Sequence, residues 1–135
     1  MPPPPDRPYF SLSLTAAPED IDELGHVNNA VYLRWIQAVA VAHWQASARA
    51  EDRDRYIWVV SRHEIDYRAP TLLGEQLIAT TWVGTPSGAR FDRHVEIVGS
   101  DGRLRCKALT IWALLDAQSR RLVRVPAEVA APFLG

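Results

Sequence analysis

One segment of the chain, Asn29 to Ala48, is apolar along almost its whole length and contains neither glycine nor proline, a pattern that predicts a helix. At about 100° per residue, its polar side chains Arg34, Gln37 and Gln45 fall in one stripe narrower than about 90°, and His43 points the opposite way. At about 1.5 Å per residue the helix is roughly 30 Å long, the width of a small domain. So narrow a polar stripe predicts a helix that protein covers on most sides.

Five further segments have patterns typical of β-strands. The first alternates apolar and polar residues, and the others are rich in β-branched and aromatic residues and are separated by turn signals such as "GTPSG" and "GSDG". The predicted strands are Tyr9–Thr15, Ile57–Tyr67, Leu77–Val83, Phe91–Val98 and Leu104–Leu115. We interpret "RAEDRDR" (49–55) as a charged connector, and "RVPAEVAAPF" (124–133) predicts about one helical turn.

This order of elements predicts an α+β fold: a five-stranded antiparallel sheet with one long helix over one face, the last four strands forming a meander. A single helix cannot cover both faces, and the last strand is apolar on both faces toward its end. We therefore expect self-association as a homodimer or homotetramer. Residues 9–135 form the single domain, and residues 1–8 ("MPPPPDRP") are expected to be a flexible Pro-rich tail.

Composition and charge narrow the class of protein. The chain has 135 residues and a net charge of −1, which suits one domain without an electrostatic footprint for nucleic acid. Its single cysteine, Cys106, excludes an internal disulfide and suits a reducing cytoplasm. Four scattered histidines lack the spacing of metal ligands. No segment is long and apolar enough to span a membrane, and the N-terminus lacks the apolar region of a signal peptide. We expect a soluble, cytoplasmic protein.

The candidate chemistry lies in "EDIDELGHVNN" (19–29), directly before the predicted helix. A helix N-terminus carries unpaired N–H groups and roughly half a positive charge, which suits a developing oxyanion. Asp22 could then act on a carbonyl polarised by those N–H groups, which is acyl-transfer chemistry. The alternative is structural: Asn28 or Asn29 caps the helix, Asp22 compensates its dipole, and Gly25 forms a turn. The residues alone leave both interpretations open.

The segment "DIDELGHVNNAVYLRWIQ" resembles the Asp-x-x-Gly-His-Val-Asn-Asn-x-x-Tyr signature of hot-dog-fold thioesterases related to 4-hydroxybenzoyl-CoA thioesterase. The similarity continues through "HEIDYRAPTLLGEQL" and "RVPAEV", so it covers nearly the whole chain after the tail. The resemblance implies the hot-dog fold, a five-stranded antiparallel sheet wrapped around a long central helix, in dimers with two active sites at the interface. It also implies hydrolysis of an acyl-CoA to free acid and CoA, with CoA as part of the substrate and no separate cofactor or metal.

The resemblance assigns roles within the motif. Asp22 corresponds to the catalytic aspartate, acting as nucleophile or general base, and a backbone N–H near Asn29 binds the thioester oxygen. His26 and Asn28 match the His-Val-Asn form that also occurs in plant acyl-ACP thioesterases. Those enzymes use an Asn two residues after the aspartate, where this chain has Leu24. This difference weakens the case for a catalytic Asp/Asn/His constellation and leaves Asp22 as the main catalytic candidate.

A second hot-dog clade uses a glutamate on the central helix, and the predicted helix contains no Glu or Asp, so that version is excluded. An acyl-ACP thioesterase and a non-catalytic acyl-CoA-binding domain remain alternatives, although a pure binding domain gains nothing from Asp22. A hot-dog dehydratase would need a His in a Pro/Gly-rich loop and an acid on the helix, and the chain has neither.

Further substrate-binding candidates are Gly25 of the motif, Glu64, Arg90 and Arg93. Glu64 shares a strand face with Arg62, which favours cross-strand ion pairing; the alternative places Glu64 near the partner subunit's site. Arg90 and Arg93 loosely match basic residues that hold CoA phosphates, with solvated surface charge as the alternative. We expect a buried role for His43 and an inert core thiol for Cys106.

Overall fold

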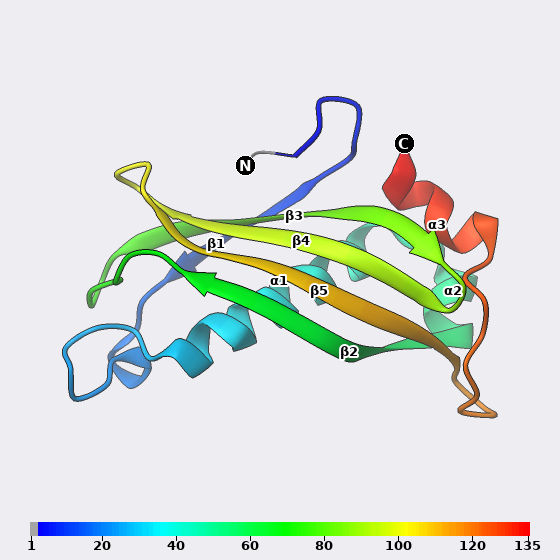
Figure 1. Ribbon diagram of the computed structural model, residues 1–135, viewed down its shortest axis with the longest axis horizontal. Helices are drawn as coiled ribbons and strands as arrows, with labels where there is room; N and C mark the ends of the chain where they lie inside the picture. The colour runs from blue at the N-terminus through cyan, green and yellow to red at the C-terminus, as the bar shows by residue number, and fades with distance from the viewer. Residues whose placement is uncertain (1–2) are drawn as a thin grey trace.

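The computed structural model describes residues 3–135, in which a long helix lies along one face of a five-stranded antiparallel sheet (Figure 1). The elements are β1 (Phe10–Thr15), a short 3₁₀ helix η1 (Pro18–Asp20), α1 (Asn29–Ser47), α2 (Ala50–Arg55), β2 (Tyr56–Tyr67), β3 (Gln76–Ser87), β4 (Arg90–Gly99), β5 (Leu104–Asp116) and α3 (Ala127–Leu134). The predicted α+β architecture, with its sheet and long helix, is confirmed. No described helix is long and apolar enough to cross a membrane.

The order of the strands differs from the predicted meander. The sheet runs β1-β3-β4-β5-β2, so only β3, β4 and β5 are consecutive neighbours. Strand β2 pairs with β5 along its length, from Tyr56↔Asp116 to Tyr67↔Cys106, and forms an edge of the sheet. The segment 68–75 carries the chain across to β3. The prediction was wrong at β2 because turn residues mark where the chain reverses, whereas strand pairing depends on distant residues.

Three boundaries also differ from the sequence prediction. Strand β3 continues through "GTP" to Ser87, and the turn consists of Gly88 and Ala89 only. Gly88 has φ +60°, a conformation that glycine favours at the first position of a two-residue hairpin loop. The connector forms the short helix α2, whose Asp52 is buried and bonded to Arg49. Helix α3 is eight residues long, because its apolar residues pack into the core.

The inner face of the sheet holds the core. Cys106, Thr110 and Leu114 of β5 are fully buried, and α1 packs mainly over β1 and β3. The buried residues of α1 are Val31, Tyr32, Trp35, Ile36, Val39, Ala40 and His43.

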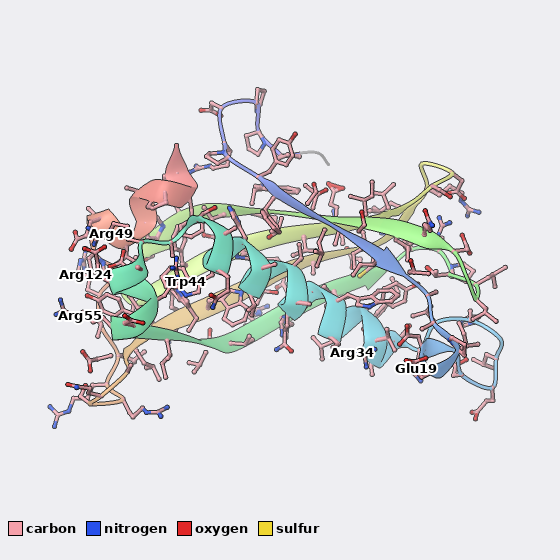
Figure 2. The ribbon with its side chains drawn as sticks, turned by 180° about the vertical axis from the view of Figure 1, so that it is seen from behind. Glu19, Arg34, Trp44, Arg49, Arg55 and Arg124 are labelled. Atoms are coloured by element: carbon pink, nitrogen blue, oxygen red, sulfur yellow. The ribbon has the colours of Figure 1, made fainter. Side chains whose placement is uncertain are left out.

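The polar stripe of α1 is exposed, but the exposed surface of the helix is wider than this stripe. It includes Ala38 and Val41, and Val41 is 50% exposed. Figure 2 shows α1 lying on the sheet with its other side open. A single chain therefore covers the helix less completely than the narrow stripe predicts.

The described part of the N-terminal segment, residues 3–8, contains a turn. The Arg7 N–H donates to the Pro4 carbonyl at 3.1 Å, and the Arg7 guanidinium lies 3.5 Å from the Leu134 carbonyl. The first two residues of the predicted tail lie outside the described residues.

Candidate active site

The loop before α1 is a tight hairpin. Ile21 and Val27 form an isolated antiparallel bridge, the Gly25 N–H donates to the Asp22 carbonyl, and the Asp22 N–H donates to the His26 carbonyl, each at 3.0 Å. Gly25 has φ +85°, as expected where a type I turn is followed by a left-handed residue. Gly25 is therefore a turn residue, and its conformation sets the position of Asp22.

The half-buried Asp22 carboxylate has different surroundings at its two oxygens. Its Oδ1 accepts a hydrogen bond of 2.9 Å from the Leu24 N–H, which closes an Asx turn. Its Oδ2 lies 3.5 Å from the Asn28 side-chain nitrogen. One oxygen is thus held by the turn, and the other faces the start of α1.

The first backbone N–H groups of α1 differ in whether they have a hydrogen-bond acceptor. Asn28 is the N-cap: its Oδ1 accepts from the Ala30 N–H at 2.8 Å, and its carbonyl accepts from the Val31 N–H at 2.9 Å. The Asn29 N–H has no hydrogen-bond acceptor among residues 3–135, and the first turn of α1 contains no acid. The capping interpretation of Asn28 is therefore confirmed. The same cap leaves one donor, at the positive end of the helix, open to a ligand oxygen.

Two residues that the sequence reasoning did not single out hold this loop in place. The buried Asp20 carboxylate accepts from Arg34 at 2.8 Å and from the Ala17 N–H at 2.9 Å, and the Asp20 carbonyl accepts from the Asn28 N–H at 3.0 Å. Figure 2 shows Arg34 on the part of α1 nearest this loop. On the other side, the Thr71 carbonyl accepts from the Val27 N–H at 2.8 Å. The loop is thus fixed both to α1 and to the β2–β3 connection.

Tyr67, at the end of β2, also lies beside the start of α1. Its hydroxyl is 3.5 Å from the Asn29 carbonyl, and its ring packs at a tilt against Tyr32, with centroids 5.8 Å apart. Partial burial raises its pKa, and the hydroxyl stays protonated. The only signal for Tyr67 in the sequence was its place in "HEIDYRAP", the second segment of the family resemblance.

His26 contributes its backbone to the hairpin. The structure shows no hydrogen bond from its imidazole to residues 3–135, and the side chain is half-buried. The structure therefore gives the His26 imidazole no hydrogen bond or ion pair with the Asp22 carboxylate.

Glu64 lies on the outer face of the sheet. It is opposite Leu109 of β5, whose neighbours Ala108 and Thr110 face inward, and it forms an ion pair with Arg62 on its own strand. The predicted pairing is present, although along one strand and not across two. Because α1 and the Asp22 loop lie on the inner face, Glu64 points away from them. The alternative that places Glu64 near the partner subunit's site stays a prediction.

Arg90 and Arg93 lie on β4, near its hairpin with β3. Arg90 is exposed, whereas Arg93 is only 8% exposed and faces inward with Phe91 and Val95. The surface-charge interpretation of Arg93 is wrong, because odd-numbered residues of β4 point toward the core. Its buried side chain also cannot reach out to a nucleotide in solvent. Within one chain this end of the sheet lies far from the Asp22 loop (Figure 1).

The two expected core residues are confirmed. His43 is buried, with its ring stacked on Phe10 and its Nδ1 accepting from Arg93 Nη1 at 2.8 Å. Burial and the neighbouring arginine lower the pKa of His43 to about 4, so it is neutral at pH 7. Burial raises the pKa of the Cys106 thiol to about 12, which leaves it unreactive. No group of three or more metal-ligating side chains occurs within residues 3–135.

Comparison with known proteins agrees with this geometry. The family model of the thioesterase-like superfamily matches residues 16–133. A solved structure of a thioesterase from Thermus thermophilus, complexed with coenzyme A and Zn, is 22% identical, with a TM-score of 0.80, and the match covers 92% of this chain and 90% of that one. A 1,4-dihydroxy-2-naphthoyl-CoA thioesterase from Synechocystis is 17% identical, with a TM-score of 0.80 over 93% of this chain and 95% of that one.

A chloroplastic acyl-[acyl-carrier-protein] hydrolase from Cuphea viscosissima is 30% identical over 74 residues, which are 54% of this chain and 18% of the plant protein. The match thus spans less than a fifth of that relative. The fold and the family match together define a hot-dog domain of the thioesterase type. This chain belongs to the thioesterase-like superfamily.

Proposed function

We propose that this protein hydrolyses an acyl-CoA thioester to a free acid and CoA, with Asp22 as nucleophile or general base. The observation that carries the proposal is the combination of an oriented Asp22 carboxylate with an unpaired Asn29 N–H at the positive end of α1. The CoA carrier is favoured by similarity to a structure described as a complex with coenzyme A.

In the proposed reaction the thioester carbonyl oxygen accepts a hydrogen bond from the Asn29 N–H. Asp22 either attacks the carbonyl carbon or takes a proton from an attacking water. The negative charge that develops on the carbonyl oxygen is stabilised by the N–H donor and the helix end. Collapse of the tetrahedral species breaks the carbon–sulfur bond and releases the CoA thiolate. Water supplies the second oxygen of the acid, either as the attacking molecule or by hydrolysing the acyl–Asp22 anhydride that the nucleophilic route forms, and the reaction requires no cofactor.

Four further assignments belong to this proposal. We retain Asn28 as the residue that caps α1 and faces Asp22, and His26 as a loop residue beside the substrate. Arg90, exposed on β4, is our candidate for binding CoA phosphate. Replacing it with alanine should raise KM with little change in kcat, since that contact is the same in the ground and transition states. The assembly is a homodimer or homotetramer, in which a second copy covers the open side of α1.

The Asp22→Asn variant tests the central assignment. It keeps the size of the side chain and an oxygen for the Asx turn but removes the nucleophile and base. We expect kcat to fall by at least about 10²-fold, the usual effect of losing a positioned acid–base group, with little change in the melting temperature. Glu23→Gln, at an exposed acid in the same turn, is the matched control and should retain activity. Retention of more than a third of wild-type hydrolysis by a folded Asp22→Asn would contradict the assignment.

The match to a plant acyl-[acyl-carrier-protein] hydrolase favours a second candidate, in which an acyl carrier protein replaces CoA. Hydrolysis of one acyl group presented on CoA and on the carrier protein distinguishes the two. Higher kcat/KM on CoA is the outcome that we expect.

A further inference from the structure

A cavity of about 270 Å³ lies beneath the C-terminal half of α1, between this helix and strands β2, β4 and β5. Its first residue on α1, Ala40, is 11 positions beyond Asn29, about 16 Å along the helix. Within one chain the cavity is therefore separate from the Asp22 loop. Figure 2 shows Trp44 at this end of α1. Six aromatic residues line the cavity: Trp44, Tyr56, Trp58, Phe91, Trp112 and Phe133.

Arg93 brings a buried positive charge to this aromatic cavity. Its Nη1 donates to His43 Nδ1 at 2.8 Å and to Thr81 Oγ1 at 3.1 Å, and its guanidinium lies 5.9 Å from the centre of the Phe133 ring. All three partners are neutral, and no carboxylate of residues 3–135 forms an ion pair with Arg93. Burial lowers the pKa of Arg93 to about 10, so the group is still charged at pH 7. A buried charge without a counter-charge is costly, and proteins normally pair such groups.

Trp112 contributes its ring, and not its N–H, to the cavity. The strand register pairs Phe91 with Trp112 and Arg93 with Thr110, so Arg93 and Trp112 lie on the inner face of neighbouring strands. The indole Nε1 of Trp112 is buried and has no hydrogen-bond partner in the described part of the chain, and a molecule in the cavity does not reach it. It is therefore the guanidinium of Arg93, which lacks a counter-charge, that indicates a bound anion.

The other charged residues that line the cavity do not neutralise Arg93. The Asp92 side chain belongs to the outer face, where its Oδ1 accepts from the Thr85 N–H at 2.9 Å. Arg53 is half-buried and donates to the Ala48 carbonyl. The cavity therefore favours an anion.

We propose that this cavity binds a small carboxylic acid with an apolar, ring-sized body, whose carboxylate pairs with the Arg93 guanidinium while its body packs among the aromatic rings. The size is appropriate, because an apolar cavity of about 150 Å³ can hold benzene, and 270 Å³ leaves room for a carboxylate and a short linker. Free acids are also the class of compound that thioester hydrolysis releases. The site is nevertheless inferred from the cavity alone and does not depend on Asp22.

Binding can be measured on the full-length protein by calorimetry and by tryptophan fluorescence, since Trp44, Trp58 and Trp112 line the cavity. The probe is 3-phenylpropionate. Its matched controls are 3-phenylpropanol, which has the same body without the charge, and propionate, which has the charge without the ring. We expect one acid per chain, bound at least about 10-fold more tightly than either control, the effect of a charged hydrogen bond. Equal affinity for the acid and the alcohol would overturn the proposal.

Variants assign the binding to Arg93 and to the aromatic lining. Arg93→Gln should abolish the preference for the acid over the alcohol, and Trp58→Leu, which removes a ring from the cavity, should weaken the binding of both. Arg124→Gln, at an exposed arginine outside this cavity, should change neither affinity. Circular dichroism checks folding, and Trp58→Leu provides the test if Arg93→Gln does not fold. Unchanged acid binding in either folded variant refutes the site.

The Asp22→Asn variant separates this inference from the proposed function. It should retain full binding of 3-phenylpropionate, whatever its effect on hydrolysis. Loss of acid binding in Asp22→Asn would place the acid at the catalytic loop and overturn the proposal.

Discussion

Replacing Asn28 with aspartate tests the predicted relation between the cap of α1 and the catalytic acid. Aspartate is about as good an N-cap as asparagine, so the oxygen that accepts from the Ala30 N–H is retained. The side-chain nitrogen that lies 3.5 Å from Asp22 Oδ2 becomes a second carboxylate oxygen. The substitution thus adds a like charge beside Asp22 while keeping the helix capped.

The expected shift of the pH–rate profile follows from that distance. Two unit charges 3.5 Å apart repel by about 1.2 kcal/mol in a water-like dielectric, which corresponds to about 0.9 pH unit. Repulsion makes the Asp22 carboxylate harder to form, and the proposed mechanism uses that carboxylate. The acidic limb of the kcat/KM profile should therefore move to higher pH by about 0.9 unit.

The assay is steady-state hydrolysis of an acyl-CoA from pH 4 to 9, with a thiol reagent suited to that range. Asn28→Ser keeps the cap without a charge, so its acidic limb should stay at the wild-type position. The melting temperatures of both variants should lie close to that of the wild type. An acidic limb that does not move in a stable Asn28→Asp protein would show that ionisation of Asp22 does not control the rate.

Three other predictions concern the fold around the site. Gly25→Ala should destabilise the protein by about 1 kcal/mol and lower kcat, because φ is +85° at this position and alanine disfavours it; an unchanged melting temperature would contradict this. The pKa of His43 falls from 6.5 to about 4 on folding, so the unfolded state binds more protons between these values. Stability should decrease as the pH falls from about 6.5 toward 4, by up to about 3 kcal/mol, and His43→Gln should weaken that dependence in urea titrations. Sedimentation should show a dimer or tetramer at micromolar concentration, and a stable, active monomer would refute self-association.

Local patterns were sufficient for much of this fold. The glycine-free apolar run set the limits of α1 to within a residue, and the strand patterns located all five strands. The position of β2 could not be obtained in this way, because its pairing with β5 joins residues far apart in the chain. The burial of Arg93 was missed for a related reason: the sequence showed that its strand alternates but did not show which face packs under α1.

The candidate site was predictable to a similar degree. The motif located Asp22, Gly25 and Asn28 on one loop, and the capping geometry of Asn28 followed from its place before the helix. Which N–H the cap leaves open could be determined only from the structure, since Asn28 can bond to either of two donors. Tyr67 lies at the end of β2 and Thr71 in the β2–β3 connection, and both are far from the loop along the sequence. No local spacing therefore connects them with α1.

The attachment of the Asp22 loop to Thr71 has a consequence for folding. Residues 22–29 are synthesised early, but their support includes the β2–β3 connection, whose position depends on β2 pairing with β5. Pairings between such distant residues are slow to form, because a large loop must close first. The geometry of the candidate site is therefore completed only when the last strand joins the sheet. A nascent chain that has not yet made β5 would hold every motif residue without the arrangement that the proposed function needs.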